Sequence, residues 1–115
     1  MGLTIRELVA AATNPKPVET DIPGLGLVFI RVLTVGEALA AKDEAEEAKR
    51  DPLKIAIRGF CRYLVDAENI TQYDAKNPEH SEMLTTLPLG VLRNVMEAGN
   101  RVNGIGDAPK APEKN

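Results

Sequence analysis

Few side chains in this sequence could perform chemistry, and their spacing does not bring them together. The one histidine, His80, lies in a polar stretch, and the one cysteine, Cys61, lies in an apolar periodic segment. Neither Cys-x-x-Cys nor His-Glu-x-x-His occurs, so no zinc site is predicted. Ser81 has no accompanying base that would activate its hydroxyl. We therefore expect a protein that is not an enzyme and that carries no metal ion or cofactor.

Two other patterns bear a partial likeness to ligand sites. Gly24-Leu25-Gly26 lacks the third glycine of a dinucleotide-binding loop and precedes an expected strand rather than a helix, which favours a simple turn. The acidic cluster lies on an expected helix and lacks the turn geometry of a calcium loop, so it is typical of a solvated helix face. Its members are Asp43, Glu44, Glu46 and Glu47.

The composition predicts one small domain with an aliphatic core. The chain has 115 residues, 43% of them hydrophobic but only 3% aromatic, and a formal net charge of -3. Scattered basic residues and a net negative charge argue against binding to nucleic acid. No signal peptide and no apolar stretch of about 20 residues is recognisable, so we expect no membrane association. A domain of this size is marginally stable, which favours a homo-oligomer.

Local signals predict an α+β fold that is mostly helical, with four to five helices and an N-terminal β-hairpin. Capping-box patterns predict helices over about 4–13 and 34–50. The second of these is charged on almost every side, and its thin alanine seam faces either its own chain or a neighbouring subunit. Shorter signals predict helices over 81–87 and from Pro88 to a stop at Asn103-Gly104.

The most regular apolar periodicity belongs to the helix that begins at Asp51-Pro52, where aspartate caps the helix and proline occupies its first position. We expect this helix to be the centre of the core. Its apolar face is predicted to consist of Leu53, Ala56, Ile57, Phe60, Cys61 and Leu64.

The segments 17–22 and 25–33 predict the hairpin, with Pro23-Gly24 at the centre of a type II turn. The second strand is apolar on both faces, because Leu27 and Phe29 alternate with Val28, Ile30 and Val32. A hairpin offers the core only one face. The other face must be covered by a helix of the same chain or by another molecule.

The order of the segments carries a family resemblance. Near its start the chain has TIRELVAAAT, then a short acidic strand and DIPGLGLVFIRVLTVGEALA. It continues with LKIAIRGFCRYLVD, a polar loop and LTTLPLGVLRNVMEAGNRVNGIG. This layout, over nearly the whole chain, resembles the tail assembly chaperones of long-tailed, non-contractile (siphovirus-type) bacteriophages. The loop ENITQYDAKNPEH departs from that pattern because it lacks the acidic turn expected there.

The resemblance implies a protein that binds the tape measure protein, keeps that long apolar helical chain soluble, and helps to recruit the major tail protein. It implies action in the cytoplasm of the bacterial host and absence from the mature virion. Many such proteins have a longer product made by ribosomal frameshifting, and the ending Glu113-Lys114-Asn115 is compatible with a slippery codon sequence.

We expect residues 1–105 to form a single domain of this kind and residues 106–115 to form a disordered polar tail. An alternative that shares the size and acidity is a small structural virion component, such as a neck or tail-completion protein. A DNA-binding regulator is disfavoured by the charge. The candidate partner-binding surface consists of Leu27, Val28, Phe29, Ile30, Leu39, Leu92, Val95 and Met96.

Overall fold

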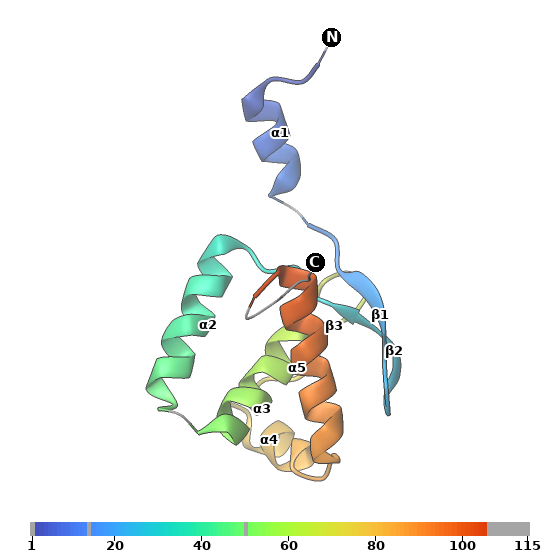
Figure 1. The fold of residues 1–115 in the computed structure, drawn as a ribbon, viewed down its shortest axis with the longest axis vertical. Helices are drawn as coiled ribbons and strands as arrows, with labels where there is room; N and C mark the ends of the chain where they lie inside the picture. Colours follow the sequence, from blue (N-terminus) through green and yellow to red (C-terminus); the bar gives the residue numbers. More distant parts are fainter. Residues whose placement is uncertain (1, 14, 50, 106–115) are drawn as a thin grey trace, which may run out of the picture.

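The computed structural model describes residues 2–13, 15–49 and 51–105, and the tail expected at 106–115 lies outside them. The described residues confirm the predicted α+β class, with an N-terminal hairpin followed by helices that pack on one side of a small sheet (Figure 1). In chain order the elements are α1 (Ile5–Ala12), β1 (Val18–Ile22), β2 (Gly26–Ile30), α2 (Val35–Glu47), α3 (Pro52–Tyr63), β3 (Leu64–Val65), α4 (Pro78–Leu84) and α5 (Leu89–Asn103).

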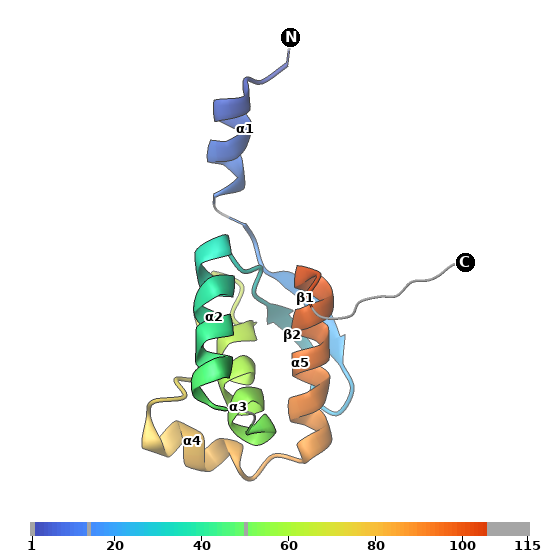
Figure 2. The same ribbon diagram turned by 60° about the vertical axis from the view of Figure 1, so that its left-hand side comes forward.

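The hairpin forms as its turn residues predict. The Leu25 amide donates to the Ile22 carbonyl at 2.9 Å, and Gly24 has a φ of 87°. Proline before a glycine of positive φ is the type II arrangement. One face of the sheet is covered by α5, which lies across β1 and β2 (Figures 1 and 2). On that face Ile22 and Ile30 are fully buried.

The short strand β3 corrects the sequence prediction, which continued the core helix through Leu64. The helix ends at Tyr63, and Leu64 adopts an extended backbone with φ -86° and ψ 113°. Pairing with β2 accounts for the change, since Ile30 lies opposite Leu64 and the Arg31 amide donates to the Tyr63 carbonyl at 2.8 Å. The backbone of this segment therefore completes the sheet.

Helix α4 also differs from the prediction, because it spans Pro78–Leu84 rather than 81–87. Its N-cap is Asn77, whose side chain accepts hydrogen bonds from the Glu79 and His80 amides at 2.9 and 3.3 Å. Asparagine followed by proline is a common helix start. That signal was present in the sequence, within the stretch that was assigned to a loop.

The core forms where α3 crosses α5, and a glycine from each helix permits their close approach. A Cβ atom on Gly99 would lie 2.2 Å from the Tyr63 ring, and one on Gly59 would lie 1.9 Å from the Met96 sulfur. Gly99 therefore lies at a close contact between the two helices. The Tyr63 hydroxyl then donates to Asn100 Oδ1 at 2.8 Å.

Hydrogen bonds of one side chain, Asn103, join the segment after β2 to the end of α5. The amide of Leu33 donates to Asn103 Oδ1 at 2.7 Å. In return, Asn103 Nδ2 donates to the carbonyl oxygens of Arg31 and Gly99, at 3.1 and 2.9 Å. The last strand residue is Ile30 and not the predicted Leu33. Beyond it, the Leu33 amide and the Arg31 carbonyl bond to the Asn103 side chain and not to a neighbouring strand. Gly104 ends α5 with a φ of 64°, as its sequence predicts.

The glycine contacts make a testable prediction about stability. Gly99→Ala should lower the free energy of unfolding by about 1–3 kcal/mol, because a rigid aromatic ring and two helix backbones must move apart. Gly59→Ala should cost less, since its neighbour is the flexible end of Met96. Gly90→Ala is the matched control on α5, where an added Cβ meets nothing within 4 Å. Urea unfolding measures all three, and equal effects at Gly99 and Gly90 would contradict the close crossing.

Candidate partner-binding surface

Three residues of the predicted surface belong to the interior. Ile30 and Val95 are 0% exposed and Leu92 is 5% exposed, all within the core cluster between the sheet, α3 and α5. This is a correction to the sequence analysis, because side chains in this position cannot contact a partner without unfolding the core. The apolar periodicity of these residues indicates that they are covered, but it does not indicate whether the core or a partner covers them.

Three more of the predicted residues are half-buried. Val28 and Met96 pack against the edge of the core. Phe29 lies on the opposite face of the sheet from Val28, and its strand partner there is Val65. The sequence had left open whether this second face is covered by the same chain, and at Phe29 and Val65 the chain covers it substantially.

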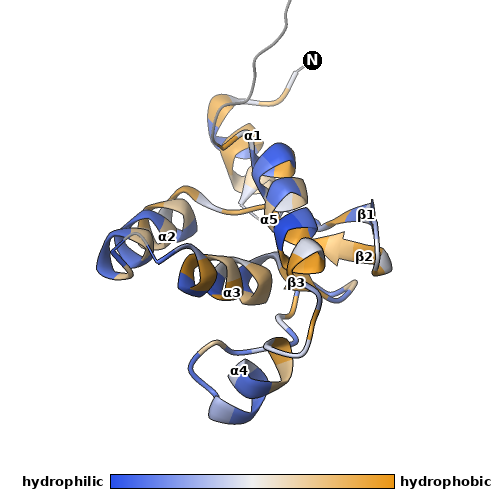
Figure 3. Ribbon diagram, turned by 60° about the horizontal axis from the view of Figure 1, so that its bottom comes forward, coloured by the Kyte–Doolittle hydropathy of each residue, from blue (hydrophilic) through white to orange (hydrophobic). Residues whose placement is uncertain are grey.

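The remaining two residues are exposed, Leu27 at 69% and Leu39 at 60%. The structure does not bring them together. Leu27 lies on β2 and Leu39 on α2, and Figures 1 and 3 both show these elements on opposite sides of α3 and α5. They therefore do not form one surface, and the apolar contact area predicted from the sequence is divided between two sites.

A further exposed apolar stripe lies on α1, outside the candidate surface predicted from the sequence. Every residue of α1 is exposed, and the helix projects from the rest of the chain (Figures 1 and 2). Ile5 is 75% exposed, and Leu8 and Val9 are at least half exposed. With Ala12 these residues follow the i, i+3, i+4, i+7 spacing of one helix face. That spacing was readable in TIRELVAAAT and could have identified the stripe.

Local sequence explains why α1 forms and why it remains separate. The Thr4 hydroxyl accepts the Glu7 amide at 3.2 Å, and the Glu7 carboxylate accepts the Thr4 amide at 2.9 Å, which is the predicted capping box. Pro15 and Pro17 follow the helix, and they restrict the backbone of the linker to extended conformations. A linker of this kind acts as a short spacer and disfavours folding α1 back onto the body.

His80 and Ser81 each make a hydrogen bond to the backbone of the loop before α4. His80 Nδ1 accepts the Asp74 amide at 3.0 Å, and its ring meets Tyr73 edge-on with 5.5 Å between centroids. The Ser81 hydroxyl donates to the Ala75 carbonyl at 2.9 Å. These bonds fix the loop before α4. The described residues contain no group of three or more His, Cys, Asp or Glu side chains placed to hold a metal ion.

Cys61 is buried in the core, and it is one of the residues that line a cleft of about 410 Å³ between α2, α3 and residues 71–76. Burial raises the pKa of the thiol from 9.0 to about 11, and the Asp74 carboxylate adds to this effect, while Arg62 opposes it. A thiol with this pKa is a poor nucleophile at neutral pH. The lone cysteine therefore acts as a small apolar core residue, as its sequence position predicts.

A second cleft, of about 450 Å³, lies between the linker and the start of α2. Its charged residues are Lys16, Arg31, Glu37 and Glu68. Two of them already engage each other, because Arg31 Nη1 donates to Glu37 Oε2 at 2.9 Å. Mixed charges without a paired nucleophile and base give this cleft no evident catalytic arrangement.

Comparison with models of known protein families, with curated proteins and with solved structures gives no match to this chain. In the described part of the chain, no helix is both long enough and apolar enough to cross a membrane.

The environment of Cys61 predicts its reactivity. When the pKa rises from 9.0 to about 11, the thiolate fraction at pH 8 falls about 100-fold. Alkylation by iodoacetamide at pH 8 should therefore be slow in the folded protein and fast in urea. Between pH 9 and pH 11 the Cys61 thiol ionises in the unfolded chain but stays protonated in the folded one, so its contribution to stability should fall as pH rises through this window. Equal alkylation rates with and without urea would contradict the buried position.

Proposed function

We propose that this protein is a phage tail assembly chaperone, which binds the tape measure protein, keeps it soluble, and helps to recruit the major tail protein. The observation that carries the proposal is α1, an amphipathic helix whose apolar face packs on nothing in the described chain. The sequence resemblance to such chaperones supports it. The structural use made of His80, Cys61 and Ser81 agrees with a binding role.

The energetics of α1 favour binding coupled to helix formation. An isolated helix of 8 residues is marginal in water even with good caps. Burial of the three large apolar side chains, Ile5, Leu8 and Val9, would contribute about 4.5–9 kcal/mol. Ordering eight residues costs about 8–16 kcal/mol. These values are comparable, so contact with a partner decides whether the helix persists, and the helix can be exchanged among clients.

The client that fits this surface is an apolar helix. A two-turn stripe of Ile5, Leu8 and Val9 presents branched aliphatic side chains at helical spacing, which is the pattern used when one amphipathic helix lies along another. The tape measure protein is such a client, since it is a long and largely helical chain. On this proposal the protein acts in the host cytoplasm and is released before the virion is complete.

The stripe on α1 gives a direct test of client binding. Leu8→Gln should weaken binding of a helical tape measure segment about 10- to 150-fold, because it removes about 1.5–3 kcal/mol of apolar burial. Ala10→Gln, on the polar side of the same helix, is the matched control and should bind like the wild type. Isothermal titration calorimetry measures both. Wild-type affinity in Leu8→Gln would show that α1 does not bind the client.

A second experiment separates a chaperone from a structural virion component. Quantitative mass spectrometry should find peptides of this chain in infected-cell lysate at high abundance and should find none in purified virions. Peptides that continue past Asn115 in the -1 frame would also support the frameshifted product. Stoichiometric peptides in the virion would overturn the chaperone proposal and favour a neck or tail-completion protein.

A further inference from the structure

Helix α2 contributes almost nothing to the hydrophobic core. None of its 13 residues is buried, and none belongs to the core cluster. Its inner face is a seam of alanines, and Ala41 and Ala45 line a narrow gap shared with Ile55 of α3. Its larger apolar residues, Val35 and Leu39, point to solvent, and Figure 3 shows the outer side of α2 as largely hydrophilic. Because hydrophobic stabilisation scales with buried apolar area, little of it holds α2 in place.

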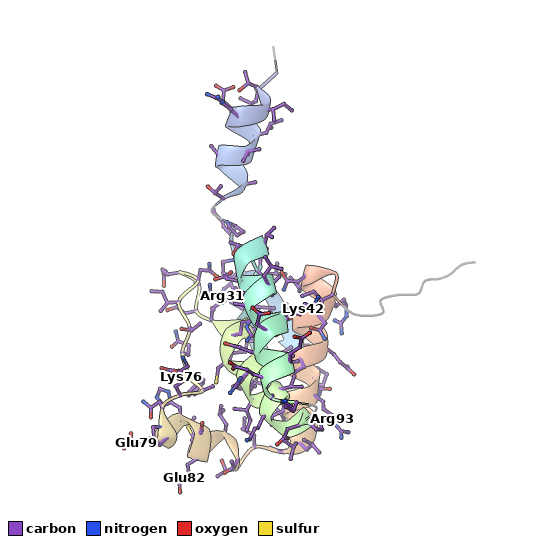
Figure 4. The ribbon with its side chains drawn as sticks, turned by 90° about the vertical axis from the view of Figure 1, so that its left-hand side faces the viewer. Arg31, Lys42, Lys76, Glu79, Glu82 and Arg93 are labelled. Carbon is purple, nitrogen blue, oxygen red and sulfur yellow. The ribbon has the colours of Figure 1, made fainter. Side chains whose placement is uncertain are left out.

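Ion pairs hold the helix instead. Three Arg–Glu pairs occur among the described residues, and every one has its glutamate on α2. They join Arg31 to Glu37 at 2.9 Å, Arg58 to Glu47 at 3.9 Å, and Arg62 to Glu44. Figure 4 looks directly onto α2 and shows Arg31 beside its upper end.

These ion pairs are of the kind that salt weakens. The glutamate side chains are 39–78% exposed, so water and dissolved ions reach one side of every pair, whereas the Arg31 and Arg62 side chains are only 16% and 20% exposed. Ionic strength therefore screens the exposed Arg58–Glu47 pair most and the two partly buried pairs less. The attachment of α2 is therefore both weak and dependent on charge.

Both ends of α2 are anchored without its help. Before the helix, Leu33 is bound to Asn103 of α5. After it, Asp51 caps α3 by accepting the Leu53 and Lys54 amides at 3.1 and 3.3 Å. Between these anchors Lys49 has a φ of 51°, an unusual left-handed conformation for a residue other than glycine. The anchors on both sides of α2 therefore do not depend on the contacts of the helix itself.

We propose that α2 is a displaceable cover, which opens as a unit while the sheet, α3 and α5 stay folded. The surface beneath it combines the apolar Ile55 with three arginines, Arg31, Arg58 and Arg62. By charge complementarity, its partner is an acidic helix with small residues on one face, the chemistry that α2 itself presents. This proposal does not depend on the role of α1 or on the identity of the client.

Hydrogen exchange measured by mass spectrometry tests the opening. Raising NaCl from 50 mM to 500 mM should make the amides of residues 35–47 exchange roughly two- to fivefold faster, with α3 and α5 unchanged. Arg62→Gln should have the same effect at low salt. The matched control is Arg93→Gln, since Arg93 is exposed on α5 and is in no ion pair within the described part of the chain. Exchange of α2 only together with α3 and α5 would overturn the proposal.

A synthetic peptide with the sequence of α2, added to the full chain, tests the surface beneath α2. The full chain carrying Glu37→Gln, Glu44→Gln and Glu47→Gln should have an open α2, which hydrogen exchange verifies. A synthetic peptide of residues 34–48 should then bind this chain and should bind more weakly as salt rises. A control peptide with the same three substitutions should not bind. Absence of peptide binding to a chain whose α2 is open would overturn the partner assignment.

Discussion

The fold depends on the close crossing of α3 and α5, where a glycine in each helix leaves room for a side chain of the other helix. Gly59 receives Met96, and Gly99 receives the ring of Tyr63. Reciprocal contacts of this kind fix both the distance and the rotation of two helices, because neither can turn without driving a side chain into a backbone. The sheet packs against α5, and β3 continues from the end of α3, so the position of every strand follows from this crossing.

Local signals in the sequence were sufficient for the elements whose stability is local. The capping boxes at Thr4 and Thr34, the Asp51-Pro52 helix start and the Pro23-Gly24 turn each fix a few hydrogen bonds between near neighbours, and each is present as predicted. The element that was missed, β3, has no such signal. Its residues continue an apolar helical pattern, and only pairing with a strand more than thirty residues earlier makes them extended.

The distinction between local and tertiary signals also explains why the candidate partner-binding surface was only partly correct. Apolar spacing marked Ile30, Leu92 and Val95 as residues that need cover, but this spacing is the same for a core and for an interface. The two differ only in what covers them, which is a property of the tertiary structure. Helix α1 shows the converse case, because its stripe has the pattern of a core helix and yet lies outside the core.

The core, helix α2 and helix α1 therefore differ in the kind of interaction that holds each of them in place. The crossing of α3 and α5 is held by buried apolar contact, α2 by exposed ion pairs, and α1 by its own caps alone. Free energies of local opening follow the amount of buried apolar contact. On the two proposals made above, a gradient from a rigid core through a charge-held cover to an unpartnered helix would let α1 and α2 contact partners without loss of the fold. A chaperone of the proposed kind would need this property, because surfaces that open at low cost can also close again when a client leaves.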